Sequence, residues 1–311
     1  MKIFFFGTGN FGIPALEAIS KSEHELAAVV LPPSKPQGRG RKVKPAPIEV
    51  WAQSKNIEIQ YQSDVNSAVF LDSITQLKPD LFLVVSLGIK LSTDFLNLPT
   101  HQSLNIHPSL LPQYRGASPI PQALYDGKKI VGTTIMRMGQ RMDAGDILNQ
   151  SELILNGNEN ALEVWGQLAE LSADCIMQVI DQLVGATCVA MVQDENKATF
   201  CTKLSKENAS INWSKSAADI HNQVRAYFIW PGSQTTLKQE PLKIIQTQCL
   251  DMPTTTKPPG TIVQVDKLGL DIQTGRSILR ILKLQKAGSK PMDIASFLNG
   301  NALEVDMCLG E

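Results

Sequence analysis

Short apolar segments alternate with helix-like segments over the first third of this 311-residue chain. Chains with this alternation form a parallel β-sheet whose faces are covered by crossover helices. The segments predicted as buried strands are 3–6, 26–31, 81–85 and 103–106, and those predicted as helices are 11–20, 47–54 and 65–77. The sequence therefore predicts a doubly wound α/β domain, with its ligand site at the carboxyl ends of the strands.

A second pattern begins after the sheet. Residues 153–155 are predicted as a last strand, and 161–184 have apolar positions at helical spacing and end at Gly185. After the polar segment 190–208 we predict a helix and five short strands separated by turns, at 217–227, 234–237, 242–248, 260–265, 269–273 and 278–284. We therefore expect a first domain over 1–189, a linker over 190–208, and a small β sandwich or barrel over 209–311.

Composition limits the partners and the compartment. The formal net charge is -1, so local basic patches, not the overall charge, would have to hold a polyanion. The five cysteines are scattered without a C-x-x-C pair, which argues against a zinc site and a disulfide framework and favours a reduced, cytoplasmic protein. The apolar start, residues 1–6, is too short for a signal peptide or a membrane span, and we expect no membrane partner.

Residues 7–12 read Gly-Thr-Gly-Asn-Phe-Gly, a literal G-x-G-x-x-G between a predicted strand and a predicted helix. Such a turn binds a dinucleotide when an acidic residue at the end of the next strand holds the ribose. Here that strand runs into Leu31-Pro-Pro-Ser-Lys-Pro36, which has no carboxylate. We therefore interpret the glycines as packing residues of a tight turn and expect no NAD.

The densest group of chemically useful residues begins where the predicted strand at 103–106 ends. Asn105 and His107 project to the same side of an extended chain, and Pro108 favours the extended conformation of His107. Asp143 follows downstream, so an amide, an imidazole and a carboxylate are available to polarise a carbonyl and move a proton in acyl transfer. From the residues alone, a loop cap is an equal alternative for Asp143.

The region around these residues resembles the signature of the folate-dependent formyltransferases. The residues that carry the resemblance are Asn105, His107, Ser109 to Pro112, Arg115, Gly116, Asp143, Gly145 and Asp146. Further matches lie at 38–47, 203–206 and 211–214. The resemblance implies a Rossmann-like domain followed by an OB-like β-barrel. It also implies transfer of the formyl group of 10-formyltetrahydrofolate to the α-amine of methionyl initiator tRNA, without a metal.

The resemblance also implies roles for single residues. Asn105 and His107 would polarise the formyl oxygen, and Asp143 would support His107 and assist proton transfer. Which of His107 and Asp143 accepts the amine proton stays open, and Asp146 is interpreted as structural. The residues predicted to bind folate are Ser109, Leu110, Leu111, Pro112, Leu87 and Gly88. At Leu87 the chain departs from the family, which usually has an aromatic residue before the glycine.

Residues 35–44 hold basic side chains and no acid, between prolines and around two glycines. A run of charges is usually a solvated surface, but this one follows the second predicted strand, beside the expected ligand site. The resemblance implies that the loop grips the acceptor end of the tRNA. The predicted tRNA-binding residues are Arg39, Arg41, Lys42 and Lys44. The second domain adds Lys238, Lys243, Lys257, Lys267, Arg276, Arg280, Lys283, Lys286 and Lys290, and the sequence does not tell which of them face tRNA.

Several alternatives share this scaffold. The acceptor could be a nucleotide-linked amino sugar or glycinamide ribonucleotide, the enzyme could be a formyltetrahydrofolate hydrolase, or the chain could be a noncatalytic tRNA-binding protein. The basic loop and the basic second domain favour tRNA over a small sugar. The presence of Asn105, His107 and Asp143 argues against a noncatalytic protein. We expect a monomer.

Overall fold

The computed structural model describes residues 1–33 and 44–310. The chain forms two compact units. Unit 1 comprises Met1–Gly116, Val131–Leu153 and Trp165–Phe200, and unit 2 comprises Ala117–Ile130, Ile154–Val164 and Cys201–Glu311. No helix among the described residues has the length and apolar character needed to span a membrane.

Unit 1 is built on a seven-stranded sheet in the order β3-β2-β1-β4-β5-β7-β8. The strands are β1 Lys2–Phe6, β2 Glu25–Leu31, β3 Ile59–Tyr61, β4 Leu81–Val84, β5 Ser103–His107, β7 Ile130–Arg137 and β8 Ile147–Ile154. The first five pair in parallel, whereas β7 runs antiparallel to β5. The doubly wound domain predicted from the sequence is confirmed, with the strand order 3-2-1-4-5 that is typical of the Rossmann-like folds.

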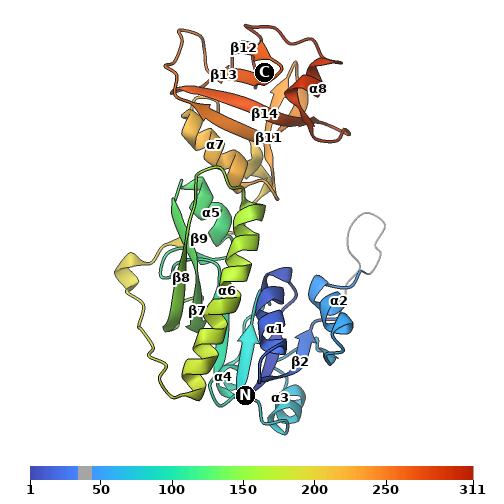
Figure 1. The fold of residues 1–311 in the computed structure, drawn as a ribbon, viewed down its shortest axis with the longest axis vertical. Helices are drawn as coiled ribbons and strands as arrows, with labels where there is room; N and C mark the ends of the chain where they lie inside the picture. The colour runs from blue at the N-terminus through green and yellow to red at the C-terminus, as the bar shows by residue number, and fades with distance from the viewer. Residues whose placement is uncertain (34–43, 311) are drawn as a thin grey trace. The chain divides into compact units, whose positions relative to one another are not determined.

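Apolar residues on both faces of β1 and β4 explain why these strands are central. The ring of Phe6 lies 4.8 Å from that of Phe82 and 4.9 Å from that of Phe95, measured between centroids. The sheet is accompanied by η1 Asn10–Gly12, α1 Ile13–Ser20, α2 Pro47–Ser54, α3 Ala68–Thr75, α4 Thr93–Asn97 and α6 Ala161–Val184. Helix α6 runs along β7 and β8 (Figure 1), where the hydroxyl groups of Ser172 and Thr133 are 2.7 Å apart.

The sequence prediction was wrong about both edges of this sheet. It placed a strand at 153–155, whereas β8 spans Ile147–Ile154, and it missed β3 and β7. Strand β8 is half-exposed and carries polar residues such as Asn149 and Glu152, so it lacks the apolar signature of a buried strand. Strand β7 buries Thr133 and Thr134, whose hydroxyl groups are hydrogen-bonded.

The turn at residues 7–12 is tightly packed. A Cβ atom at Gly7 would lie 1.9 Å from the carbonyl oxygen of Val85, and one at Gly12 would lie 2.6 Å from the ring of Phe5. The first neighbour is backbone directly after β4, and the second is the fully buried ring of Phe5 on β1, so the core leaves no space for either Cβ atom. Packing alone therefore accounts for these two glycines, as the sequence led us to expect.

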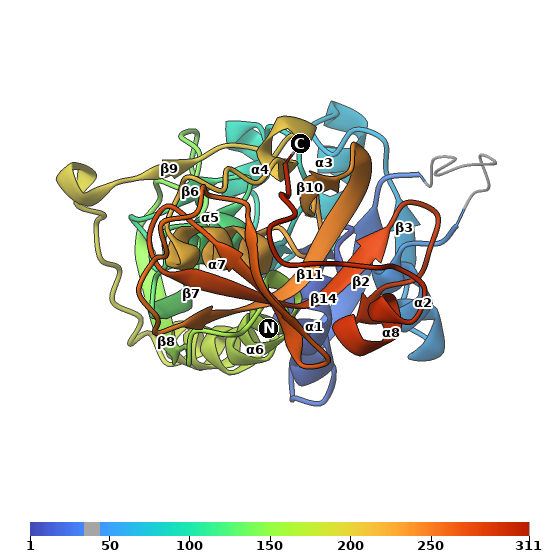
Figure 2. The same ribbon diagram turned by 90° about the horizontal axis from the view of Figure 1, so that it is seen from above.

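Unit 2 contains an antiparallel sheet in the order β10-β11-β14-β13-β12, with β15 paired to β14. The strands are β10 Ser233–Leu237, β11 Glu240–Leu250, β12 Ile262–Asp266, β13 Gly269–Gln273, β14 Ile278–Lys286 and β15 Met292–Asp293. Figure 2 shows the long strands β11 and β14 side by side. The two edges are joined by the end of the chain, because Leu309 bridges Leu237 and Cys308 bridges Thr261. The predicted small barrel is confirmed.

The described residues of unit 2 include the α-helices α5 Pro119–Tyr125, α7 Ala217–Ala226 and α8 Ile294–Leu298 and the 3-10 helix η3 Lys206–Ala209. On α7, His221 is buried; its Nε2 donates to the carbonyl oxygen of Gly157 at 3.1 Å, so its Nδ1 accepts from the hydroxyl of Thr247 at 2.9 Å. Burial lowers the pKa of His221, and the nearby Arg225 lowers it further. The surroundings of this ring therefore fit the neutral imidazole.

Candidate active site

Strand β5 places Asn105 and His107 on one face of the sheet, because alternate residues of a strand point the same way. Asn105 lies between Val84 of β4 and Met136 of β7 in the strand register. His107 is buried, whereas Asn105 keeps part of its surface. Within the part of the chain that the structure describes, the Asn105 side chain makes no hydrogen bond, so its amide donors are available to a ligand.

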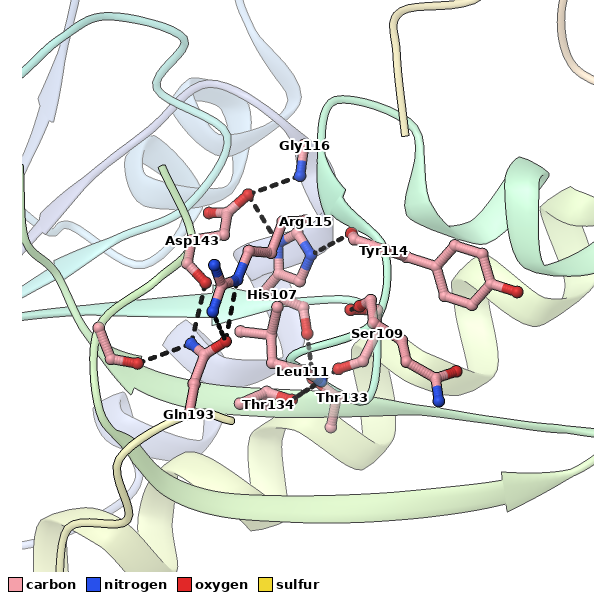
Figure 3. Close-up of polar contacts among 12 residues, drawn as sticks. His107, Ser109, Leu111, Tyr114, Arg115, Gly116, Thr133, Thr134, Asp143 and Gln193 are labelled. Carbon is pink, nitrogen blue, oxygen red and sulfur yellow. Dashed lines mark hydrogen bonds and ion pairs between the residues drawn. The ribbon is translucent and has the colours of Figure 1, made fainter. Parts of the chain in front are cut away.

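His107 is held by two contacts that Figure 3 shows on opposite sides of the ring. Its Nε2 donates to the carbonyl oxygen of Tyr114 at 3.0 Å, and its Nδ1 lies 3.7 Å from Oδ2 of Asp143. The second distance is too long for a hydrogen bond, and the contact becomes an ion pair only when the ring is protonated. The carbonyl oxygen of His107 also accepts a 3.4 Å hydrogen bond from Thr133. The imidazole therefore has a fixed orientation, with Nδ1 directed at the carboxylate.

Asp143 lies in the loop 138–146, which joins β7 to β8. Its Oδ2 accepts a 2.8 Å hydrogen bond from the backbone N–H of Gly116, and its backbone is left-handed, with φ 49°. The loop passes close to β7 at Gly145, where a Cβ atom would lie 1.8 Å from the carbonyl oxygen of Arg137. The carboxylate that faces His107 is thus carried by a left-handed residue, in a loop that packs closely against the end of β7.

Arg115 connects this loop to a distant segment of the chain. The Arg115 guanidinium donates to the side-chain oxygen of Gln193 and to the carboxylate of Glu195, and the Gln193 amide donates to the carbonyl oxygens of Asp143 and Gly145. Arg115 is 2% exposed, and its hydrogen bond is the main cause of the lowered pKa of Glu195. Arg115 is part of the sequence motif, where no role was predicted for it, and Gln193 and Glu195 were not predicted as functional residues.

Thr134 on β7 organises the turn at Ser109–Pro112. Its hydroxyl donates to the carbonyl oxygen of Ser109 at 2.6 Å, and it accepts from the N–H of Leu111 at 3.1 Å and from the amide of Gln150 at 2.8 Å. A hydroxyl has one proton and two lone pairs, so all of its hydrogen-bonding positions are used. Gln150 also donates to the carbonyl oxygen of Leu111 at 2.8 Å. These buried contacts hold the turn in one conformation.

The residues predicted to bind folate differ in exposure. Ser109 and Leu111 are buried within unit 1, whereas Leu110 and Pro112 keep exposed surface. A ligand at this turn would therefore meet Leu110, Pro112 and the backbone.

The second predicted folate loop follows β4. Leu87 packs partly against the aromatic cluster around Phe82. Gly88 is exposed, with φ 73° and no atom within 4 Å of the position of a Cβ. The open surface of this loop is thus at Gly88, while Leu87 is divided between the core and solvent.

Of the four predicted tRNA-binding residues in the basic loop, Lys44 is among the residues that the structure describes. Arg39, Arg41 and Lys42 lie outside the described residues, and Lys44 is exposed. In the described ranges, no group of three or more His, Cys, Asp or Glu side chains could hold a metal ion.

Two family models match the chain. Residues 1–180 match the Formyl transferase model, and residues 203–302 match the model of the Formyl transferase, C-terminal domain. The chain belongs to the formyl transferase family. The resemblance seen in the sequence is thereby confirmed. Residues 181–202 of this formyl transferase, which include Gln193 and Glu195, lie between the two matched regions.

Relatives of known name match this formyl transferase over nearly their full length. The methionyl-tRNA formyltransferase of Syntrophomonas wolfei is 39% identical over 311 residues, which cover 100% of this chain and 99% of the relative. That of Methylococcus capsulatus is 35% identical over 303 residues, covering 97% and 98%. A solved structure, the N-formyltransferase of Helicobacter canadensis in complex with folinic acid and dTDP-3-aminofucose, has a TM-score of 0.68. It is 17% identical and covers 90% of this chain and 98% of that one, so it supports the fold.

Proposed function

We propose that this formyl transferase moves the formyl group of 10-formyltetrahydrofolate to the α-amino group of methionyl initiator tRNA. The observation that carries the proposal is the pairing of His107 with Asp143 beside the available amide of Asn105, in a chain that matches methionyl-tRNA formyltransferases from end to end. The product, N-formylmethionyl-tRNA, serves translation initiation.

The three side chains suit the charges and protons of this reaction. When bound, 10-formyltetrahydrofolate supplies an electrophilic formyl carbon. The neutral amine forms a bond to this carbon, the bond from the carbon to the folate nitrogen breaks, and negative charge develops meanwhile on the formyl oxygen. The amide of Asn105 and a protonated Nδ1 of His107 can donate to that oxygen, which stabilises the charge. The attacking amine loses one proton and the folate nitrogen gains one.

The proton transfer is assigned to the pair formed by His107 and Asp143. Nε2 of His107 is engaged with Tyr114, so Nδ1 is the ring nitrogen that can exchange a proton with a substrate. Asp143 lies on that side of the ring and stabilises positive charge on it. The 3.7 Å gap leaves both groups free to contact the amine. We therefore treat the pair as one acid–base unit.

Folate fits the exposed part of the turn at 109–112. Leu110 and Pro112 offer apolar surface beside backbone groups, which suits a flat ring system with a hydrogen-bonding edge. Gly88 adds a surface without a side chain, so a ligand can approach its backbone closely.

The tRNA requires basic surface. Support comes from the predicted loop residues Arg39, Arg41, Lys42 and Lys44, and from the exposed barrel residues Lys238, Lys267, Arg276 and Lys290. Two other basic residues of the barrel are engaged with acids. Arg280 pairs with the buried Asp271, and Lys257 pairs with Asp306. We therefore do not assign Arg280 or Lys257 to phosphate contacts.

A formylation assay with two acceptors tests the proposal. Methionyl initiator tRNA and a nucleotide-linked amino sugar are each incubated with labelled 10-formyltetrahydrofolate and the protein. We expect label on the tRNA. Label on the sugar alone would assign the chain to the amino-sugar enzymes, and label on neither acceptor would favour the noncatalytic alternative.

We propose a cytoplasmic protein, which agrees with the scattered cysteines of the sequence. We also propose the division into a catalytic domain over 1–189, a linker over 190–208 and a tRNA-binding barrel over 209–311. The proposed monomer is tested by light scattering of the purified protein.

A further inference from the structure

We propose that Gln193 is a positioning residue for formyl transfer: it joins Arg115 to the backbone of the loop 138–146 and so holds Asp143 against His107. The inference rests on the proposed function, because that function gives Asp143 and His107 their catalytic roles. Gln193 itself is 5% exposed and is separated from Asp143 by 50 residues of chain.

The hydrogen bonds of Gln193 leave one possible orientation of its amide. The Nε2 group donates to the carbonyl oxygens of Asp143 at 2.9 Å and Gly145 at 2.7 Å. The Oε1 atom accepts from Nε of Arg115 at 3.0 Å and from Nη2 at 2.8 Å. Carbonyl oxygens only accept and a guanidinium only donates, so a flipped amide would lose all four bonds. Figure 3 shows Gln193 between Arg115 and the loop.

Arg115 is a rigid support for this amide. Its Nη1 and Nη2 atoms donate to the two carboxylate oxygens of Glu195 at 3.0 and 3.1 Å, a bidentate geometry that fixes the guanidinium plane. The ring of Phe200 lies over the guanidinium, 6.0 Å from its central carbon. An arginine that is buried and held in this way has little rotational freedom. It therefore fixes the position of the Gln193 amide, and Gln193 in turn fixes the carbonyl groups of the loop.

The same two neighbouring residues, Arg115 and Gly116, hold both parts of Asp143. The backbone of Asp143 is held through Gln193 by the side chain of Arg115, and its carboxylate accepts the N–H of Gly116. Loss of Gln193 would remove the donors of two loop carbonyls and leave the carboxylate tied at one point. Nδ1 of His107 and Oδ2 of Asp143 are 3.7 Å apart and make no direct hydrogen bond. The contact between these two side chains is therefore too weak to hold Asp143 in its position beside His107.

Gln193→Glu is the informative variant. A glutamate keeps the length of the side chain and still pairs with Arg115, but its oxygens cannot donate to the carbonyls of Asp143 and Gly145. We expect kcat for methionyl-tRNA to fall by about tenfold or more, since displacement of a reacting group by about 1 Å has effects of this size. The KM values should stay within about twofold of wild type, because the loop would act on the transition state and not on binding. Gln178→Ala, on the exposed surface of α6, is the matched control and should keep wild-type rates.

A double-mutant cycle with Asp143→Asn separates positioning from general stability. If Gln193 acts through Asp143, then Gln193→Glu has little further effect on kcat in the Asp143→Asn background. Equal effects in both backgrounds, or a wild-type kcat for Gln193→Glu, would overturn the inference. A wild-type rate for Asp143→Asn would instead remove the catalytic role of Asp143, and with it the basis of the inference.

Thermal melting with and without a reduced folate checks that the variants fold. If Gln193→Glu melts well below wild type, Gln193→Met replaces it in the cycle, since methionine has the same length and no charge. The same loss of kcat and the same absence of effect beside Asp143→Asn are expected. Full activity of a folded Gln193→Met protein would refute the positioning role.

Discussion

Nε2 of His107 and the carbonyl oxygen of Tyr114 are 3.0 Å apart, and a carbonyl oxygen can only accept a hydrogen bond. Nε2 therefore carries a proton in every state that keeps this contact. The other nitrogen, Nδ1, is left to face Asp143 and the substrate. This single contact decides which atom of the ring can take part in chemistry.

His107→Gln separates the two nitrogens. The Nε2 group of glutamine can still donate to Tyr114, but nothing replaces Nδ1, so we expect a stable protein whose formyl transfer is slowed by about a hundredfold or more. Asn105→Ala and Asp143→Ala should each have effects of about this size, and the effects should not add, because the groups act together. Single-turnover rates measure this. A double Asn105/His107 variant with a near-normal rate would contradict the assignment.

Gly145→Ala should disturb the same site without removing any polar side chain. The new Cβ would lie 1.8 Å from the carbonyl oxygen of Arg137, so the loop must move and Asp143 with it. We expect kcat to fall by about tenfold or more. Gly139→Ala is the control, because this glycine lies in the same loop and has no atom within 4 Å of its Cβ position. Equal activity of the two variants would show that the loop tolerates displacement.

His221 should make unfolding sensitive to pH. Burial lowers its pKa in the folded protein from the ordinary value of 6.5, so the unfolded chain binds a proton that the folded chain resists. The stability that the neutral ring supports is present above about pH 6.5 and is lost as the pH falls below it. Urea unfolding between pH 5 and 8, roughly the range in which histidine titrates, measures this dependence.

Two variants of His221 isolate the effect. His221→Gln keeps a donor for Gly157 and does not titrate, so its free energy of unfolding should depend less on pH than that of wild type. His221→Ala leaves Gly157 and Thr247 without their partner, at a cost of about 1–3 kcal/mol. If wild type and His221→Gln gave parallel curves, another group would be responsible for the pH dependence.

Arg39→Ala tests the basic loop. If Arg39 contacts a phosphate, its loss should weaken tRNA binding and reduce the slope of affinity against salt concentration by about one. Folate binding and hydrolysis of the formyl donor without tRNA should be unchanged. Lys21→Ala is the control, since Lys21 is exposed and pairs with Glu17. Equal affinities and parallel salt curves for Arg39→Ala and wild type would mean that the loop is an ordinary solvated surface.

Much of the fold could be predicted because its signals are local. Strand β4 is apolar and buried along its whole length, and the helix 161–184 was predicted with the bounds that the structure gives. The missed strands differ in this respect: β3 is only three residues long, whereas β7 is rich in β-branched residues and carries a local strand signal that was not recognised. Strand β7 buries threonines whose partners come from elsewhere in the chain, and no spacing rule relates Gln193 to Arg115, which lies 78 residues earlier. Contacts between distant polar residues depend on the finished fold, so a single sequence does not contain their pattern.

The left-handed backbone of Asp143 has a conformational cost to folding, while its carboxylate is needed for the proposed activity. A residue with a Cβ atom loses about 1 kcal/mol in this conformation, whereas glycine adopts it freely. Glycine at this position would relieve the backbone cost, but the protein would lose the hydrogen bond from Gly116 and the carboxylate beside His107. Engineering for robustness should keep this position fixed and look for gains elsewhere, since catalytic geometry of this kind is maintained by function and not by folding.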